Sequence, residues 1–187
     1  MPLRLLPLFL LAPLAAAQPA PFETLALSAS GVSTLAGAPY TDFWDPGLGV
    51  ELRVATPFYL GRVAGGVVVA PHETFDAAIP DYLALYFFGA WSTEIPLPGG
   101  LRLAPGVQAG LFRMQFDADD AASVNNEAEL AAGPEVWLSV PVARGWRVQA
   151  GAGAVRLFTN ERIDLGFARL GVSRTVLTPG WLRDFLR

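Results

Sequence analysis

Apolar side chains recur at every second position over long stretches of this 187-residue chain. In Val50–Phe58, the positions between the mostly apolar ones carry Glu51, Arg53, Ala55 and Pro57. In Glu127–Val142, apolar side chains again fill alternate positions, opposite a face that carries Glu129 and Glu135. A period of two is the signature of a β-strand whose two faces meet different surroundings.

Eight segments show this alternation, clearly or weakly. They are Phe22–Gly31, Val50–Phe58, Arg62–Pro71, Tyr82–Ile95, Leu101–Leu111, Glu127–Val142, Trp146–Ala154 and Arg162–Leu177. The last segment alternates poorly around Phe167–Arg169, which predicts a β-bulge there. Most are longer than ordinary strands, and membrane strands need about 9–11 residues. We therefore expect an all-β fold, a single up-and-down antiparallel transmembrane β-barrel of about eight strands.

The first seventeen residues read as a secretory signal peptide. Arg4 precedes the apolar run Leu5–Leu14, and Ala15-Ala16-Ala17 provides a cleavage site of small residues. The run is shorter than the roughly 20 residues of a spanning helix, and two prolines interrupt it. We expect residues 1–17 to be removed, residues 18–177 to form the barrel, and residues 178–187 to form a short periplasmic tail.

Composition narrows the functional classes. Hydrophobic residues make up 52% of the chain and charged residues only 16%, a balance that is unusual for a soluble domain. The net charge of −4 argues against a nucleic-acid partner, because there is no basic surface to neutralise phosphates. The absence of cysteine rules out disulfides and cysteine-based zinc sites. No cofactor and no metal site are predicted.

The connections between the predicted strands alternate in length. Those at residues 32–48, 72–81 and 117–126 are long, whereas 59–61, 96–100, 143–145 and 159–161 are short. Outer-membrane barrels have long extracellular loops and short periplasmic turns. Acidic residues collect in or beside the predicted outer loops: Asp42, Asp45, Glu73, Asp76, Asp81, Asp117, Asp119, Asp120, Glu127 and Glu161. Arginines collect at the other end: Arg62, Arg102, Arg144, Arg147, Arg183 and Arg187.

With these features the chain resembles the small outer-membrane barrels of the OmpA, OmpX and OmpW kind. The similar pieces are Leu101–Val107 after a Pro-Gly-Gly turn, and Val140–Trp146 at a tight turn. The resemblance implies a monomer in a Gram-negative outer membrane, with both termini in the periplasm. It also implies contact with membrane lipid and lipopolysaccharide, and assembly by the barrel-assembly machinery. One departure is the ending, where Thr178-Pro179-Gly180 interrupts the last strand before Trp181–Arg187.

Polar side chains on the less apolar faces are expected to point into the barrel. They are Glu51, Arg53, Arg102, Gln108, Glu129, Glu135, Arg147 and Gln149. Buried opposite charges must pair, so the first hypothesis is a structural network that plugs the lumen. The second is a narrow pore for small-molecule passage, or a ligand slot lined by Tyr82, Tyr86 and Phe88.

Other functional classes have weaker signals. His72 is the single candidate base for hydrolysis of lipid, but no serine stands in a recognisable motif, so no enzyme activity is predicted. Asp117-Ala118-Asp119-Asp120 offers oxygen ligands for calcium, and equally suits a solvated acidic loop. A soluble periplasmic lipocalin-like barrel that binds a ligand would instead turn the polar face of every strand outward and the apolar face inward. A surface adhesin would use the outer loops, where Tyr40, Phe43 and Trp44 lie.

Overall fold

The computed structural model describes residues 20–37, 40–75, 79–116, 126–158 and 163–185. The predicted signal peptide and the Asp117–Asp120 cluster lie outside these residues, as do Asp76, Glu161 and Arg187. Among the described residues, no helix has both the length and the apolar character needed to cross a membrane.

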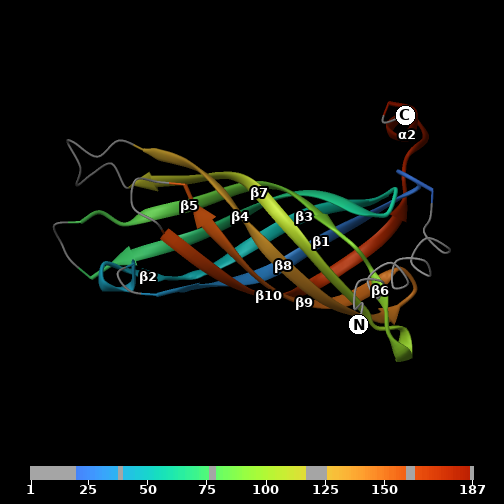
Figure 1. The fold of residues 1–187 in the computed structure, drawn as a ribbon, viewed down its shortest axis with the longest axis horizontal. Coiled ribbons are helices and arrows are strands. Elements are labelled where there is room, and N and C mark those ends of the chain that lie inside the picture. The colour runs from blue at the N-terminus through green and yellow to red at the C-terminus, as the bar shows by residue number, and fades with distance from the viewer. Residues whose placement is uncertain (1–19, 38–39, 76–78, 117–125, 159–162, 186–187) are drawn as a thin grey trace, which may run out of the picture.

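Eight long strands form the body of the molecule (Figure 1). They are β1 (Thr24–Ala36), β3 (Leu48–Phe58), β4 (Gly61–Thr74), β5 (Tyr82–Ser92), β7 (Arg102–Phe116), β8 (Glu127–Ala143), β9 (Trp146–Leu157) and β10 (Ile163–Leu177). Each pairs antiparallel with its neighbour, and β10 pairs with β1 from Thr24↔Leu177 to Ala36↔Leu165. This last pairing closes the sheet, so the predicted up-and-down barrel is confirmed.

Short elements occupy the connections. The 3-10 helix η2 (Tyr40–Asp42) and the strand β2 (Trp44–Pro46) lie between β1 and β3, and β2 pairs with the end of β4. The strand β6 (Ile95–Pro96) and the 3-10 helix η3 (Pro98–Gly100) lie between β5 and β7. A helix, α2 (Gly180–Phe185), follows β10. We call the end with the connections after β1, β4, β7 and β9 the loop end, and the opposite end the turn end (Figure 1).

Two local predictions are wrong. The predicted bulge at Phe167–Arg169 is absent from β10, which keeps continuous register with both neighbours over these residues. Its alternation looked irregular because Leu165 and Phe167 are apolar yet point into the barrel. The register shift lies instead in β8, between Pro141 and Ala143. His72, predicted in a loop, is inside β4 and only 1% exposed.

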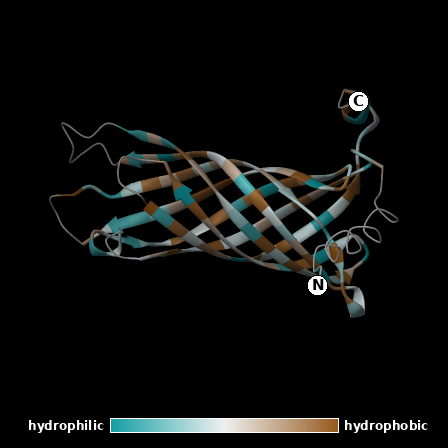
Figure 2. Ribbon diagram, viewed as in Figure 1, coloured by the Kyte–Doolittle hydropathy of each residue, from teal (hydrophilic) through white to brown (hydrophobic). Residues whose placement is uncertain are grey.

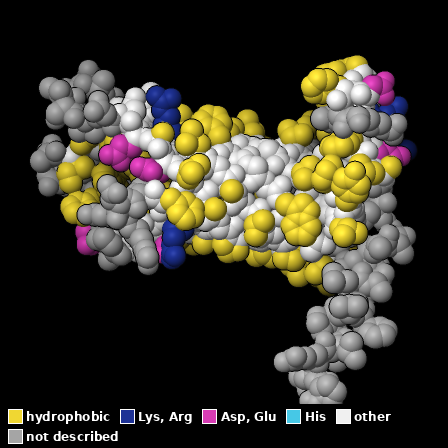
Figure 3. All heavy atoms as spheres, turned by 45° about the horizontal axis from the view of Figure 1, so that its top comes forward, with side chains coloured by type: hydrophobic (Ala, Val, Ile, Leu, Met, Phe, Trp, Pro, Cys, Tyr) yellow, Lys and Arg dark blue, Asp and Glu magenta, His cyan; other side chains and the backbone are white. Residues whose placement is uncertain are grey.

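The outer surface is apolar over most of its height. Leu52, Val54, Phe87, Leu130 and Leu170 point outward and are 46–66% exposed. Figure 3 shows hydrophobic side chains along the body of the barrel, with charged side chains gathered towards the two ends. Figure 2 shows how hydrophobic and hydrophilic residues alternate along the strands. Leaving so much apolar surface in water is unfavourable, so this exterior suits a hydrocarbon environment.

Candidate functional site

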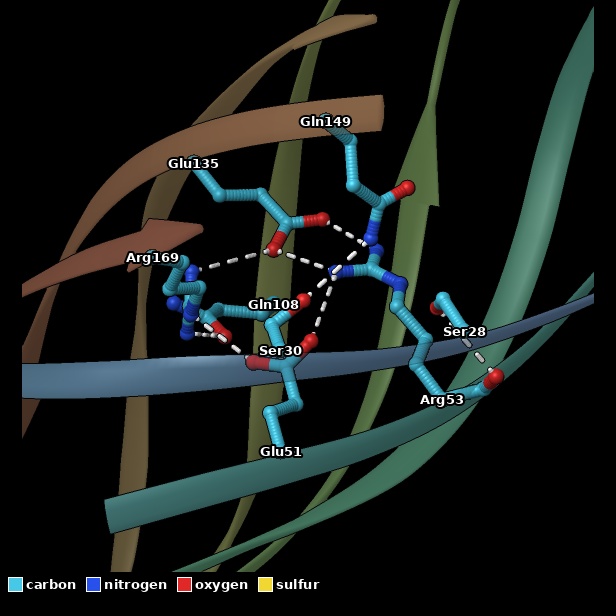
Figure 4. A network of polar contacts seen from close by, with 8 residues as sticks. All are labelled: Ser28, Ser30, Glu51, Arg53, Gln108, Glu135, Gln149 and Arg169. Atoms are coloured by element: carbon cyan, nitrogen blue, oxygen red, sulfur yellow. Dashed lines mark hydrogen bonds and ion pairs between the residues drawn. The ribbon is translucent and has the colours of Figure 1, made fainter. Parts of the chain in front are cut away.

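The strongest candidate site is a group of charged side chains midway along the lumen (Figure 4). Glu51 and Arg53 come from β3, Glu135 from β8 and Arg169 from β10. Each is at most 8% exposed. Each lies on an inward position of its strand, because side chains along a strand alternate between the two faces.

The four charges alternate in sign and bridge the lumen. Arg169 Nε lies 2.8 Å from Glu51 Oε2, and Arg53 Nη1 lies 2.9 Å from Glu135 Oε2. Arg53 Nη2 makes a second contact with Glu135 Oε1, so this pair is bidentate. Longer contacts complete the ring: Arg53 to Glu51 at 3.8 Å and Arg169 to Glu135 at 3.7 Å. We call these four residues the central network; its formal charges sum to zero.

Neutral polar groups lie around the central network, and one of them, Gln108, is bonded to it. Arg169 Nη2 donates to Gln108 Oε1 at 3.2 Å, and Gln149 Nε2 donates to Ser30 Oγ at 3.4 Å. Both guanidinium groups lie over the ring of Trp137, with Arg53 Cζ 5.2 Å and Arg169 Cζ 5.4 Å from its centroid. Cations over an aromatic face are attracted by its quadrupole, so Trp137 stabilises both arginines inside the barrel.

Glycines in β9 make room for these large side chains. A Cβ at Gly151 would come within 2.6 Å of the Trp137 ring, and one at Gly153 within 3.1 Å of Arg169 Nη1. Gly151 is the direct partner of Trp137 across the β8–β9 pairing. The small residues of this strand are therefore part of the packing of the central network.

Towards the loop end, aromatic rings fill the lumen. Tyr86 packs against Phe88, Phe112 and Phe167 with ring centroids 5.4–6.3 Å apart. Tyr82, Tyr86 and Phe88, the residues predicted to line a ligand slot, are 1–6% exposed, and Tyr86 and Phe88 pack on each other. Rings that pack together in this way occupy the space that a ligand would need.

At the loop end, Tyr40 of η2 and Trp44 of β2 pack against the aromatic rings of the lumen, and β2 extends the wall of the barrel by pairing with the end of β4. The hydroxyl groups of Tyr40 and Tyr82 are hydrogen-bonded, and the ring of His72 stacks on Tyr82 at 4.6 Å. Trp44 meets Tyr82 edge-on at 5.6 Å. Burial raises the pKa of the Tyr40 phenol, so it stays neutral and keeps its hydrogen bond. No pattern in the sequence indicates this packing, since it depends on where β2 pairs with the end of β4.

The other predicted lumen residues lie away from the central network. Arg102 and Arg62 share the carboxylate of Glu94 at the turn end, each at 2.9 Å. Arg147 donates to Ser139 Oγ at 3.0 Å and to the carbonyl oxygen of Gly100 at 2.9 Å. Glu129 is half-buried, opposite Phe112 on β7.

Sequence reasoning missed Arg169, a member of the central network. The signal for it was available, because Ala168, Leu170 and Val172 form an outward run that places Arg169 inward. Within the described residues, no group of three or more histidine, cysteine, aspartate or glutamate side chains is placed to hold a metal ion.

Comparison with solved structures identifies the architecture. A major outer membrane protein from Thermus thermophilus superposes with a TM-score of 0.58 at 16% identity, covering 82% of this chain and 98% of that one. The fold is that of the small outer-membrane β-barrels. Ail, the attachment invasion locus protein of Yersinia pestis, gives 0.56 at 11% identity over 82% and 97% of the two chains. Neisserial surface protein A gives 0.55 at 13% over 81% and 95%. The sequence matches no protein-family profile, and no curated protein is detectably similar to it.

Proposed function

We propose that this chain is an integral outer-membrane protein of a Gram-negative bacterium, a monomer with its loop end outside the cell and its turn end in the periplasm. The apolar outer surface supports a membrane environment, and the separation of charges to the two ends supports a spanning orientation. A soluble lipocalin-like barrel would need a polar exterior, which the outward positions do not provide.

We further propose that its role is structural and that its lumen is closed. The observation that carries this proposal is the central network, whose four charged side chains bridge the lumen while at most 8% exposed. Water reaches these groups so little that a continuous aqueous path along the axis is disfavoured. The aromatic layer around Tyr86 supports the same conclusion.

Adhesion through the outer loops is less well supported. Tyr40 is buried and Trp44 is half-buried against Tyr82, which leaves Phe43 as the exposed member of the predicted contact set. One solved Ail structure is a complex with the heparin analogue sucrose octasulfate. The acidic residues in the loops of this chain would repel such a polyanion.

Conductance in planar lipid bilayers tests the closed lumen. The purified barrel, shown to be folded by its mobility shift on heating, is added to the bilayer beside an open porin as a positive control. We expect no stepwise conductance from this chain. Reproducible single-channel steps that disappear with heat-denatured protein would reject the closed lumen and favour the narrow pore.

A further inference from the structure

The tail that follows β10 carries a set of apolar side chains that the barrel does not use. The helix α2 lies at the turn end and to one side of the barrel, away from its axis, in both Figure 1 and Figure 3. It therefore does not cross the mouth of the lumen, and a plug is not its role.

The apolar side chains of this end are unusually exposed. Six large apolar residues of the described chain are at least 70% exposed, and five of them lie at the turn end. These five are Tyr59 (71%), Leu60 (70%), Leu177 (78%), Trp181 (73%) and Phe185 (82%). Trp181 and Phe185 are four residues apart and so share one face of α2. We call these five residues the turn-end patch.

The root of the tail is fixed to the barrel rim. The backbone N–H of Thr178 donates to the carbonyl oxygen of Glu23 at 3.1 Å, and Thr178 is only 7% exposed. The adjacent N–H of Phe22 donates to Pro57 O at 3.0 Å. The rings of Phe22, Phe58 and Tyr59 follow one another at 5.4 and 4.6 Å. The tail thus begins beside a row of aromatic side chains at the edge of the apolar outer surface.

This attachment limits how far the helix can reach. Only Pro179 separates Thr178 from the start of α2, and the six-residue helix is about 9 Å long at about 1.5 Å per residue. The headgroup layer on each side of a bilayer is roughly 5–8 Å thick. A helix tied to the rim and displaced sideways from the barrel axis is therefore within reach of that layer.

We propose that α2 is an interfacial membrane anchor that binds the phospholipid headgroup layer of the periplasmic leaflet through Trp181 and Phe185. The chemistry of the patch fits this partner, because tryptophan and tyrosine favour the membrane–water interface. Arg183 and Asp184 provide the polar side chains that a helix in this plane needs. The inference rests on the proposed membrane location, since the patch is continuous with the outer surface assigned to lipid.

The lack of cysteine makes a direct test possible, because one introduced thiol carries one label. The variants Trp181→Cys and Phe185→Cys are labelled separately with the fluorophore NBD in the full chain. Each is placed in nanodiscs of phosphatidylethanolamine and phosphatidylglycerol, whose two faces are both open to solvent. Quenching is measured with aqueous iodide and with a lipid that carries a nitroxide on its headgroup. Leu52→Cys serves as the lipid-facing control and Arg144→Cys, at an exposed turn, as the water-facing control.

We expect labels at positions 181 and 185 to be quenched by the headgroup nitroxide, and iodide quenching to be roughly threefold weaker than at position 144. Iodide quenching as strong as at position 144 would overturn the anchor. Protection from both quenchers would also overturn it, because the tail would then pack against protein. Heat-modifiability of the same samples separates the two proposals: a barrel that shifts on heating with a water-exposed tail refutes the anchor alone.

Discussion

At the residue scale, the lumen contains charged side chains, and these are stabilised by pairing with side chains of opposite charge. Removing one partner of a buried ion pair leaves an uncompensated charge, which costs far more than the pair itself contributes. Glu135, like Glu51, contacts both arginines, so removing its charge weakens two of the contacts in the central network at once.

We expect Glu135→Gln to lower the free energy of unfolding by about 3–5 kcal/mol, because two arginines would then share one carboxylate. Urea unfolding in detergent micelles, followed by tryptophan fluorescence, measures the effect. Glu129→Gln is the matched control, since Glu129 is half-buried and takes no part in the central network. Equal losses from the two variants would contradict the assigned role of Glu135.

The glycine opposite Trp137 gives a second prediction. Gly151→Ala should destabilise the barrel by about 1–3 kcal/mol, because its Cβ would meet the Trp137 ring at 2.6 Å. Gly31→Ala is the control: it faces outward, with Leu170 O as the nearest atom at 3.9 Å, and we expect little change or a small gain. The same urea titration compares them, and a neutral Gly151→Ala would show that Trp137 has room to move.

The sequence predicts whether a side chain points inward or outward only where apolar and polar residues clearly alternate along the strand. Glu51, Arg53, Gln108 and Glu135 alternate with clearly apolar neighbours, and all four side chains are buried. Arg169 was missed because its inward neighbours Leu165 and Phe167 are themselves apolar, which obscured the alternation that its outward neighbours preserve. Which inward groups contact one another across the lumen depends on closure of the sheet, and no local pattern encodes it.

At the element scale, the strands follow directly from period two, because each must satisfy different surroundings on its two faces. Their ends were less predictable. β4 continues to Thr74 because it gains β2 as an additional partner, and Tyr82–Ile95 divides into β5 and β6 before a turn. Both features depend on the conformation of the connections.

Two outward leucines on β3 test the depth of the strand in the membrane. Leu52 lies near the middle of its strand and Leu48 at the loop end, and both are exposed on the outer surface. We expect Leu52→Arg to cost about 2–4 kcal/mol of folding free energy and Leu48→Arg about 0–1 kcal/mol. Folding into phospholipid vesicles at a series of urea concentrations measures both values. A reversed order would mean that β3 is placed at a different depth.

At the scale of the whole molecule, the distribution of polarity is the main determinant of where the protein resides. The body is apolar outside and satisfied by charge pairs and aromatic packing inside, while most exposed charges lie at the two ends. In water this apolar exterior would stay exposed to solvent. In a bilayer it faces the hydrocarbon core, while the charged ends reach the two aqueous sides. The composition of the chain, with 52% hydrophobic and 16% charged residues, follows from this arrangement.

The most direct test of the membrane barrel is electrophoresis of cell fractions in SDS with and without boiling. A closed barrel keeps its hydrogen-bonded sheet in cold SDS, because every long strand is paired on both sides. We predict that the protein is found in the outer-membrane fraction and that its band changes mobility on heating. A band in the soluble fraction whose mobility does not change on boiling would contradict the membrane barrel.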